Sequence, residues 1–215
     1  MKNMTKMKDG ILLGYQASSG SMVGSVVNGV ARLSESESKR DARGGQIVHR
    51  ERFALVRYLV NLFQPALAVG FRNFVTPRRR VCAVGMSMFY NKVLFPDPES
   101  ALFDFSKLQL SKGILLPFSG LNHQFTNGVL KISWKKPQRD LNGDDTDLIY
   151  LVVYYPELEQ MEIFAEDIRR SDLKLDFSFD QDLPASVAHC YLFIASEITN
   201  AVSNSYYISV PNFKV

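Results

Sequence analysis

Two stretches of the C-terminal half alternate apolar and polar residues with the period of a β-strand. Residues 129–134 place Leu130, Ile132 and Trp134 at every second position, and residues 173–179 repeat the pattern with leucine and phenylalanine. Successive side chains of a strand point to opposite faces, so each stretch predicts a strand with one buried and one solvated face. The chain must therefore build at least one sheet against a hydrophobic core.

A strong turn signal precedes the first of these stretches. Asn127 and Gly128 separate residues 121–125 from residues 129–134, and both central positions of the expected two-residue turn need a positive φ. Further strands are expected at residues 148–155, 161–165, 189–196 and 205–210. About seven short strands within roughly 110 residues predict a β-sandwich.

The segment of residues 10–32 is rich in small residues and contains five glycines. Its short apolar runs, separated by glycines, indicate extended strands with bends. It has too few large apolar side chains to enclose a core, so we expect a strand arm that is ordered by pairing with another surface. Residues 34–45 alternate serine and glutamate and then turn basic, which is typical of a solvent-facing loop or a disordered connector.

Helical spacing begins after this segment. Between residues 46 and 63, Leu55, Tyr58, Leu59 and Leu62 recur at intervals of three and four, which predicts an amphipathic helix. Pro65 is expected to end this helix or to open the next turn. A second short helix is therefore expected after a kink, over residues 66–74.

A third helix is expected over residues 81–95, and two prolines that follow it mark a module boundary. Four of its residues are expected to face inward: Met86, Phe89, Val93 and Leu94. The predicted fold class is α+β. Residues 1–100 form a strand arm with a helical segment, and residues 101–215 form the sandwich.

Charge is distributed unevenly between these two parts. The 215 residues carry a net charge of +3, but residues 1–100 hold 15 Lys and Arg against 7 Asp and Glu (+8), whereas residues 101–215 hold 10 against 15 (−5). The sequence thus predicts a basic N-terminal module and an acidic sandwich. Two solvated surfaces of opposite bias would explain the difference, and so would a specific partner.

Motifs that carry chemistry are missing from the sequence. Two cysteines and three histidines, each alone in sequence, predict neither a disulfide scaffold nor a metal cluster. The glycine-rich segment lacks the spacing of a phosphate-binding loop, and the acidic segment of residues 140–147 lacks the glycine and glutamate positions of a calcium loop. Ser87 lacks the closing glycine of a nucleophile elbow. We therefore expect no catalytic, cofactor-binding or metal-binding residue, and no enzymatic activity.

No targeting or membrane signal is expected either. The apolar run after the basic N-terminus, Ile11, Leu12 and Leu13, is too short for a signal peptide. Charged residues near Arg50 interrupt the best candidate for a membrane span. We expect a protein that is cytoplasmic when synthesised and is not inserted in a membrane.

The second half resembles a fibronectin type III or immunoglobulin-like sandwich. The resemblance rests on residues 129–134 with Trp134, on residues 150–154, on Tyr191 in a late strand, and on residues 203–205 before the last strand. Buried Trp and Tyr side chains occupy such strands in these domains. The resemblance implies the sandwich architecture for roughly half of the chain.

Nearly the whole chain is also similar to a family of uncharacterised Bacteroidota proteins of about this length. The similar segments are residues 20–27, 50–54, 71–74, 104–107 and 202–205. That family has no assigned activity, so the resemblance implies architecture and source and transfers no catalytic residue.

We predict a non-enzymatic structural or assembly protein that binds copies of itself or other proteins, such as a virion, tail or filament subunit of a phage or mobile element. Exposed strand edges pair readily with another chain, and clustered arginines bind carboxylates or phosphates. The alternative is a cytoplasmic binding module for a protein or, less favoured, a nucleic acid. The candidate partner-binding residues are Gly20, Gly24, Val26, Val27, Arg50, Arg52, Arg57, Arg78, Arg79 and Arg80.

Overall fold

A computed structural model describes residues 5–7, 18–19, 22–27, 30–35, 44–136, 143–165 and 168–211. The chain divides into two compact units, residues 1–44 and residues 45–215. This division lies at the start of the first helix, whereas the sequence places a module boundary near residue 100. The two units are described separately.

The first unit is a four-stranded antiparallel sheet with the strand order β1-β4-β3-β2. Its strands are β1 (Thr5–Met7), β2 (Ser18–Ser19), β3 (Met22–Val27) and β4 (Val30–Glu35). Strands were expected up to residue 32, and β4 continues to Glu35, so Ser34 and Glu35, which were expected in a loop or connector, belong to a strand. Residues 36–43 lie outside the described residues.

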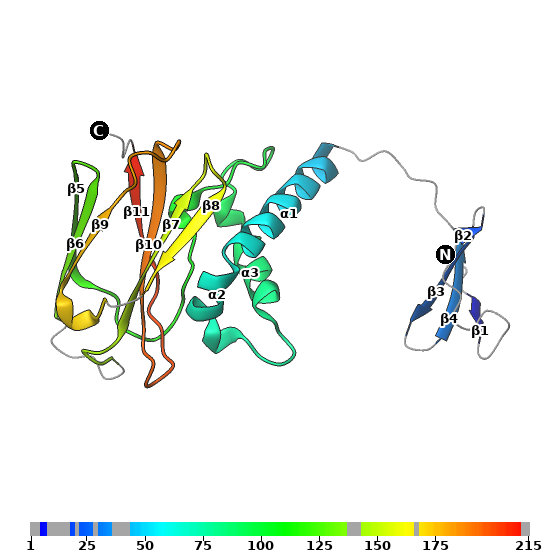
Figure 1. The fold of residues 1–215 in the computed structure, drawn as a ribbon. Coiled ribbons are helices and arrows are strands. Elements are labelled where there is room, and N and C mark those ends of the chain that lie inside the picture. The colour runs from blue at the N-terminus through cyan, green and yellow to red at the C-terminus, as the bar shows by residue number, and fades with distance from the viewer. Residues whose placement is uncertain are drawn as a thin grey trace. The chain divides into compact units, whose positions relative to one another are not determined.

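The second unit begins with three helices (Figure 1); a sharp bend joins the first two, and a longer loop leads to the third. They are α1 (Gly44–Leu62), α2 (Gln64–Gly70) and α3 (Val81–Phe89). The chain bends by 74° between α1 and α2, where Pro65 opens α2 because its missing N–H is not needed in the first turn. The kink is thus confirmed, and a second helix follows it, but this helix ends at Gly70, and residues 72–74 form a separate 3-10 turn.

The third helix is shorter than the sequence predicts. It ends at Phe89, and the Asn91 side chain then accepts a hydrogen bond from the Val93 N–H and opens a separate 3-10 turn, Lys92–Leu94. Asparagine side chains compete for backbone groups in this way and interrupt helices. Val93 was expected to face inward and is 57% exposed, while Phe89 and Leu94 are buried as expected.

Seven strands follow and form two antiparallel sheets. One sheet has the order β5-β6-β9, and the other has the order β11-β10-β7-β8. The strands are β5 (Ser119–Thr126), β6 (Val129–Lys135), β7 (Leu148–Tyr155), β8 (Gln160–Phe164), β9 (Lys174–Ser178), β10 (Val187–Ala195) and β11 (Tyr206–Pro211). The chain is therefore α+β, with a β-rich C-terminal part.

The hairpin between β5 and β6 is the one that the sequence predicts. Asn127 and Gly128 adopt φ values of +53° and +74°, as a two-residue turn that matches the strand twist requires. At β9 the expectation was wrong by one residue. Leu173 has a left-handed φ of +58° and is 38% exposed, so it forms the turn into the strand and does not face the core.

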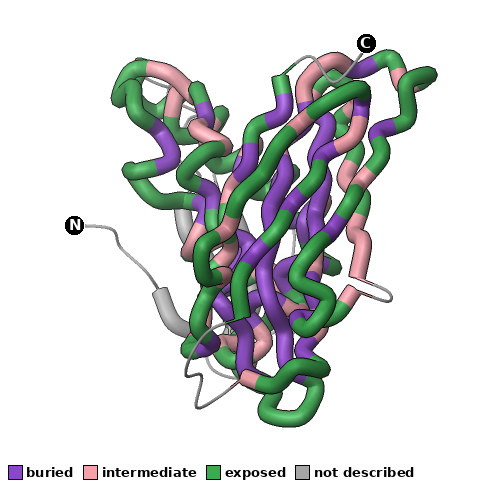
Figure 2. Tube along the Cα trace, turned by 90° about the vertical axis from the view of Figure 1, so that its left-hand side faces the viewer, coloured by how far each residue is buried: buried purple, intermediate pink, exposed green. Residues whose placement is uncertain are grey.

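Two hydrophobic cores share the four-stranded sheet β11-β10-β7-β8. The first core lies between the two sheets and contains Trp134 and Leu192, while the second lies between the four-stranded sheet and the helices and contains Phe63 and Tyr191. Buried or half-buried residues alternate with exposed ones along β6 and β9 of the three-stranded sheet, and Figure 2 shows this alternation along the tube, while β5 has no fully buried residue. By contrast, β7 and β10 are buried on both faces, which explains their continuous apolar sequences.

Candidate interaction surfaces

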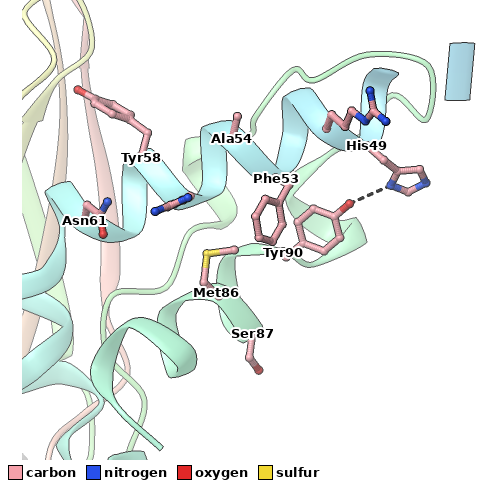
Figure 3. A pocket seen from close by; sticks show the side chains of 10 residues that line it. His49, Phe53, Ala54, Tyr58, Asn61, Met86, Ser87 and Tyr90 are labelled. Carbon is pink, nitrogen blue, oxygen red and sulfur yellow. Dashed lines mark hydrogen bonds between the residues drawn. The ribbon is translucent and has the colours of Figure 1, made fainter. Parts of the chain in front are cut away.

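An open groove with a volume of about 970 Å³ lies between α1 and α3 (Figure 3). Most of its surface is apolar. Ten residues line it, nine of them in the two helices and one, Tyr90, directly after α3. They are His49, Arg50, Phe53, Ala54, Arg57, Tyr58, Asn61, Met86, Ser87 and Tyr90.

The groove exists because the N-terminal half of α1 extends beyond the core. The buried residues of α1 are Val56, Leu59 and Val60, all in its second half. Before them, Ile47 and Phe53 are 46% and 52% exposed. A helix with an apolar stripe normally buries that stripe against a neighbour. In α1 the apolar stripe extends toward the N-terminus beyond the residues that pack on the core, so its first part stays exposed.

Aromatic side chains form the outer part of the groove. The Phe53 and Tyr90 rings meet edge to face with their centroids 6.2 Å apart, and His49 Nδ1 lies 2.8 Å from the Tyr90 hydroxyl. Figure 3 shows these three side chains together between the helices. They hold α1 to the end of α3 and leave aromatic surface open to solvent.

Two of the predicted partner-binding arginines line this groove. Arg50 and Arg57 are exposed and lie seven residues apart on α1, which places them on one side of the helix about two turns apart. None of the groove-lining residues is acidic. The groove therefore combines an apolar floor with two cationic groups.

Arg52 has a different environment from its neighbours. Its Nε and Nη2 donate to the Ser100 carbonyl at 2.8 and 2.7 Å, Nη2 also donates to the Asp97 carbonyl, and the guanidinium lies 5.0 Å from the centroid of the Phe95 ring. A half-buried guanidinium with several carbonyl acceptors and an aromatic face fixes the loop after α3 to α1.

The three consecutive arginines lie in the turn before α3. Arg78, Arg79 and Arg80 are exposed, and Thr76 and Arg79 form an isolated antiparallel bridge. The Arg79 side chain also donates to the Ser87 hydroxyl at 3.1 Å. Arg78 and Arg80 are not in the groove.

Arg72 joins distant segments of the fold, a role that the sequence does not predict. Its guanidinium donates to the carbonyls of Asn200, Ser196 and Ala201 at 2.8, 2.6 and 2.6 Å, and thereby ties the helices to the loop between β10 and β11. Burial lowers the pKa of this group. An arginine next to two partly apolar helices gives no sequence signal for such long-range acceptors.

The remaining predicted residues belong to the first unit. Gly24, Val26 and Val27 lie in β3, and Gly20 lies outside the described residues. The short strand β2 pairs only with Met22 and Val23. Among the residues that the structure describes, no strand pairs with the rest of β3 on that side.

Four carboxylates gather at one end of the sandwich, which we call the acidic end. It consists of the turn at 156–159 and the loop at 180–186. Glu157 accepts from the Ser186 backbone N–H and hydroxyl at 2.6 and 2.7 Å, which fixes the two segments together. The four carboxylates of the acidic end are Glu157, Glu159, Asp180 and Asp182, and all of them are exposed. Neither of its two segments contains Lys or Arg.

The acidic end adjoins the groove within the same copy. The Tyr58 hydroxyl lies 3.2 Å from a Glu159 carboxylate oxygen and 3.3 Å from the Glu159 carbonyl. Burial and the Glu159 carboxylate both raise the pKa of Tyr58. The two surfaces of opposite charge are therefore neighbours.

Other titratable groups are buried in the cores. His189 Nδ1 lies 2.7 Å from the Tyr207 hydroxyl, and burial lowers the pKa of this histidine and raises the pKa of Cys190 to about 12. Within the described ranges, no three His, Cys, Asp or Glu side chains are grouped so that they could hold a metal ion. No single helix in the same ranges is long and apolar enough to cross a membrane, although the bent pair α1 and α2 passes that test by length and composition.

Comparison with known families identifies the family of the chain. The model of a family of unknown function, DUF6266, matches residues 14–209. The chain belongs to this family. The matched range includes residues of both compact units, and thus covers β3, the groove and the acidic end. No curated protein matches the chain, and the family itself assigns no activity.

Proposed function

We propose that this DUF6266 protein is a non-enzymatic assembly protein whose copies bind one another through the free edge of β3. A shell, tail or filament of a phage or mobile element is the setting that we predict for it. The single observation that carries the proposal concerns the pairing of β3: among the described residues, the strand on its β2 side pairs with Met22 and Val23 and with no later residue of β3. β3 has six residues, and two residues of β2 are described beside it.

The strand register identifies the groups at this edge. β3 and β4 pair from Val27 with Val30 to Met22 with Glu35. The pair that closes a two-residue hairpin exchanges both hydrogen bonds, and the bonding direction then alternates along the strand. This alternation directs the N–H and C=O of Gly24 and Val26 away from β4. No described residue pairs with this row, and an edge of this kind accepts a strand from another chain.

A proline substitution at the edge tests the proposal. Val26→Pro removes the outward N–H of residue 26 without removing a hydrogen bond to β4. Val26→Thr keeps this N–H and is the matched control. We expect sedimentation velocity of the full chain to show association for the wild type and Val26→Thr, and weaker association for Val26→Pro. Concentrations up to about 1 mM make contacts with millimolar dissociation constants visible.

Far-UV circular dichroism of the three proteins is the control for folding, and we expect the same spectrum for all of them. A wild-type protein that stays monomeric throughout the concentration series contradicts the proposal. Association of Val26→Pro at the wild-type strength also contradicts it.

We further infer that the sandwich is of the fibronectin type III kind. Lettering the seven strands A, B, C, C′, E, F and G in chain order gives one sheet A-B-E and another G-F-C-C′, in which B pairs with E while C, F and G lie together, as in immunoglobulin-like domains. Trp134 on the second strand and Tyr191 on the sixth are buried. Cys190 is free, which distinguishes the domain from antibody domains. Superposition of an experimental structure on known sandwiches tests this inference.

The exposed arginine turn favours the alternative function, a binding module for nucleic acid or an acidic protein. Arg78 and Arg80 are exposed, and contacts of these side chains to phosphate would make binding fall steeply with salt. Binding of a single-stranded or duplex oligonucleotide that is lost in Arg78→Glu/Arg80→Glu would support it. A monomeric wild type that binds such an oligonucleotide would replace the assembly proposal with this alternative.

A further inference from the structure

The groove between α1 and α3 and the acidic end have opposite charge. Two arginines and no carboxylate line the groove. Four carboxylates and no Lys or Arg occupy the two segments of the acidic end. We infer that the groove binds the acidic end of a second copy of this chain. The inference rests on the proposed self-assembly and names a second contact between copies.

The groove has the apolar surface that a protein partner would cover. Phe53 is 52% exposed and Tyr90 is 40% exposed, and both lie in the groove with Met86 between the helices (Figure 3). Burying aromatic side chains is a main source of binding energy at interfaces. Leu158 and Leu183 of the acidic end are half-buried and Pro184 is exposed, so that end presents apolar surface together with its carboxylates.

Pairing of α1 with α1 of another copy is disfavoured by charge. Such a pairing would bring Arg50 and Arg57 of each copy close to the same arginines of the other, and α1 carries a single carboxylate, Glu51. Like charges that face one another across an interface cost free energy and reduce the association rate. The groove therefore needs an acidic partner, and the acidic end of a second copy supplies one.

Neighbouring surfaces allow the contact to be reciprocal. The Tyr58 contact with Glu159 places the acidic end beside the groove in each copy. When two complementary patches lie side by side, two copies can each offer both patches to the other. The carboxylates of one copy would then face Arg50 and Arg57 of its partner, and the reverse contact would form at the same time.

Charge reversal on each side tests the contact in the full chain. Arg50→Glu/Arg57→Glu reverses the groove, and Glu159→Lys/Asp182→Lys reverses the acidic end. We expect each variant to associate at least tenfold more weakly than the wild type in sedimentation velocity at low salt. An equimolar mixture of the two variants should associate again, because each reversed surface then meets its complement. Raising the salt from about 0.05 M to 0.5 M should weaken the wild-type contact.

Two variants control for net charge. Lys92→Glu/Lys112→Glu, at two exposed lysines, makes the same charge change outside the groove, and Glu99→Lys/Glu197→Lys does so outside the acidic end. Both should associate as the wild type does. Equal weakening by the control variants, or no recovery in the mixture, would overturn the inference. So would a monomeric wild type whose binding to phosphatidylserine vesicles is lost on groove reversal, since a lipid surface would then be the occupant.

The strand-edge variant separates this inference from the proposed function. If Val26→Pro weakens association and groove reversal leaves it unchanged, the edge contact stands and the groove inference fails. If groove reversal abolishes association and Val26→Pro leaves it unchanged, the groove contact stands and the edge proposal fails. Weakening by both changes supports both contacts, and a wild type that is monomeric at all concentrations overturns both.

Discussion

At the scale of single residues, Trp134 is a central side chain of the first core, the one between the two sheets. The side chain is 5% exposed, packs edge to face on Phe118 with ring centroids 5.2 Å apart, and donates its indole N–H to the Arg170 carbonyl at 3.1 Å. We predict that Trp134→Ala lowers the free energy of unfolding by about 3–5 kcal/mol, because it removes buried area and leaves a cavity. Urea melts measure the change. Lys131→Ala, on the solvated face of the same strand, is the control and should change stability by less than about 0.5 kcal/mol.

His189 links stability to pH. It stacks on Phe105 with ring centroids 4.8 Å apart, and burial lowers its pKa. The unfolded chain binds a proton at this residue near pH 6.5, while the folded protein binds it only at a lower pH. The free energy of unfolding should therefore fall as the pH drops through about 6.5, because the unfolded state takes up the proton first.

Urea melts at about pH 7 and pH 5.5 test this prediction. In His189→Gln, the free energy of unfolding should differ less between the two pH values than it does in the wild type. The substitution also weakens the core, but it does so at both pH values. His123→Gln, on the exposed face of β5, should keep the wild-type difference. If His189→Gln shows the full wild-type difference, the titration belongs to other groups.

At the scale of the elements, Gly70 determines how α2 meets the chain that follows α3. A Cβ at this position would overlap the Leu110 carbonyl oxygen, and the Gly70 carbonyl accepts from the Lys112 N–H at 3.1 Å. We predict that Gly70→Ala costs about 1–3 kcal/mol, because backbone must move to make room. Gly45→Ala, where a Cβ meets nothing within 4 Å, should be neutral or stabilising by up to about 1 kcal/mol, since alanine favours the helix. Equal effects in thermal melts would contradict this assignment.

Local sequence signals predicted most helices and strands, because the residues that start, bend or end these elements have backbone preferences of their own. Asn127 and Gly128 predicted the hairpin through their tolerance of positive φ, and Pro65 predicted the bend between α1 and α2. Asn91 shows the limit, since the periodicity alone did not show that this side chain would end α3. The environments of Arg52 and Arg72 depend on carbonyls far away in the sequence, and no local pattern encodes them. The groove was missed for the same reason, because it needs the positions of two helices.

At the scale of the whole molecule, the second unit has two cores on opposite faces of one sheet. Phe63 of the helical segment meets Tyr154 and Tyr191 of that sheet with ring centroids 5.3 and 6.3 Å apart. Removing the helices would therefore expose an aromatic face of β7 and β10, which a soluble domain rarely leaves uncovered. A fragment that begins with α1, at Gly44, keeps this face covered, and one that begins at residue 101 does not.

We predict that a chain of residues 44–215 unfolds in one cooperative transition, whereas a chain of residues 101–215 aggregates or binds hydrophobic dyes. The single tryptophan, Trp134, reports on the core between the sheets through its fluorescence, and circular dichroism at the helical band reports on α1, α2 and α3. The two signals should change at the same urea concentration in residues 44–215, because coincident transitions indicate a single cooperative unit. Phe63→Ala, in the core beside the helices, should shift both signals together. Separate transitions, or a residues 101–215 chain that melts cooperatively without binding dye, would instead place the folding boundary near residue 100, where the charge of the sequence changes sign.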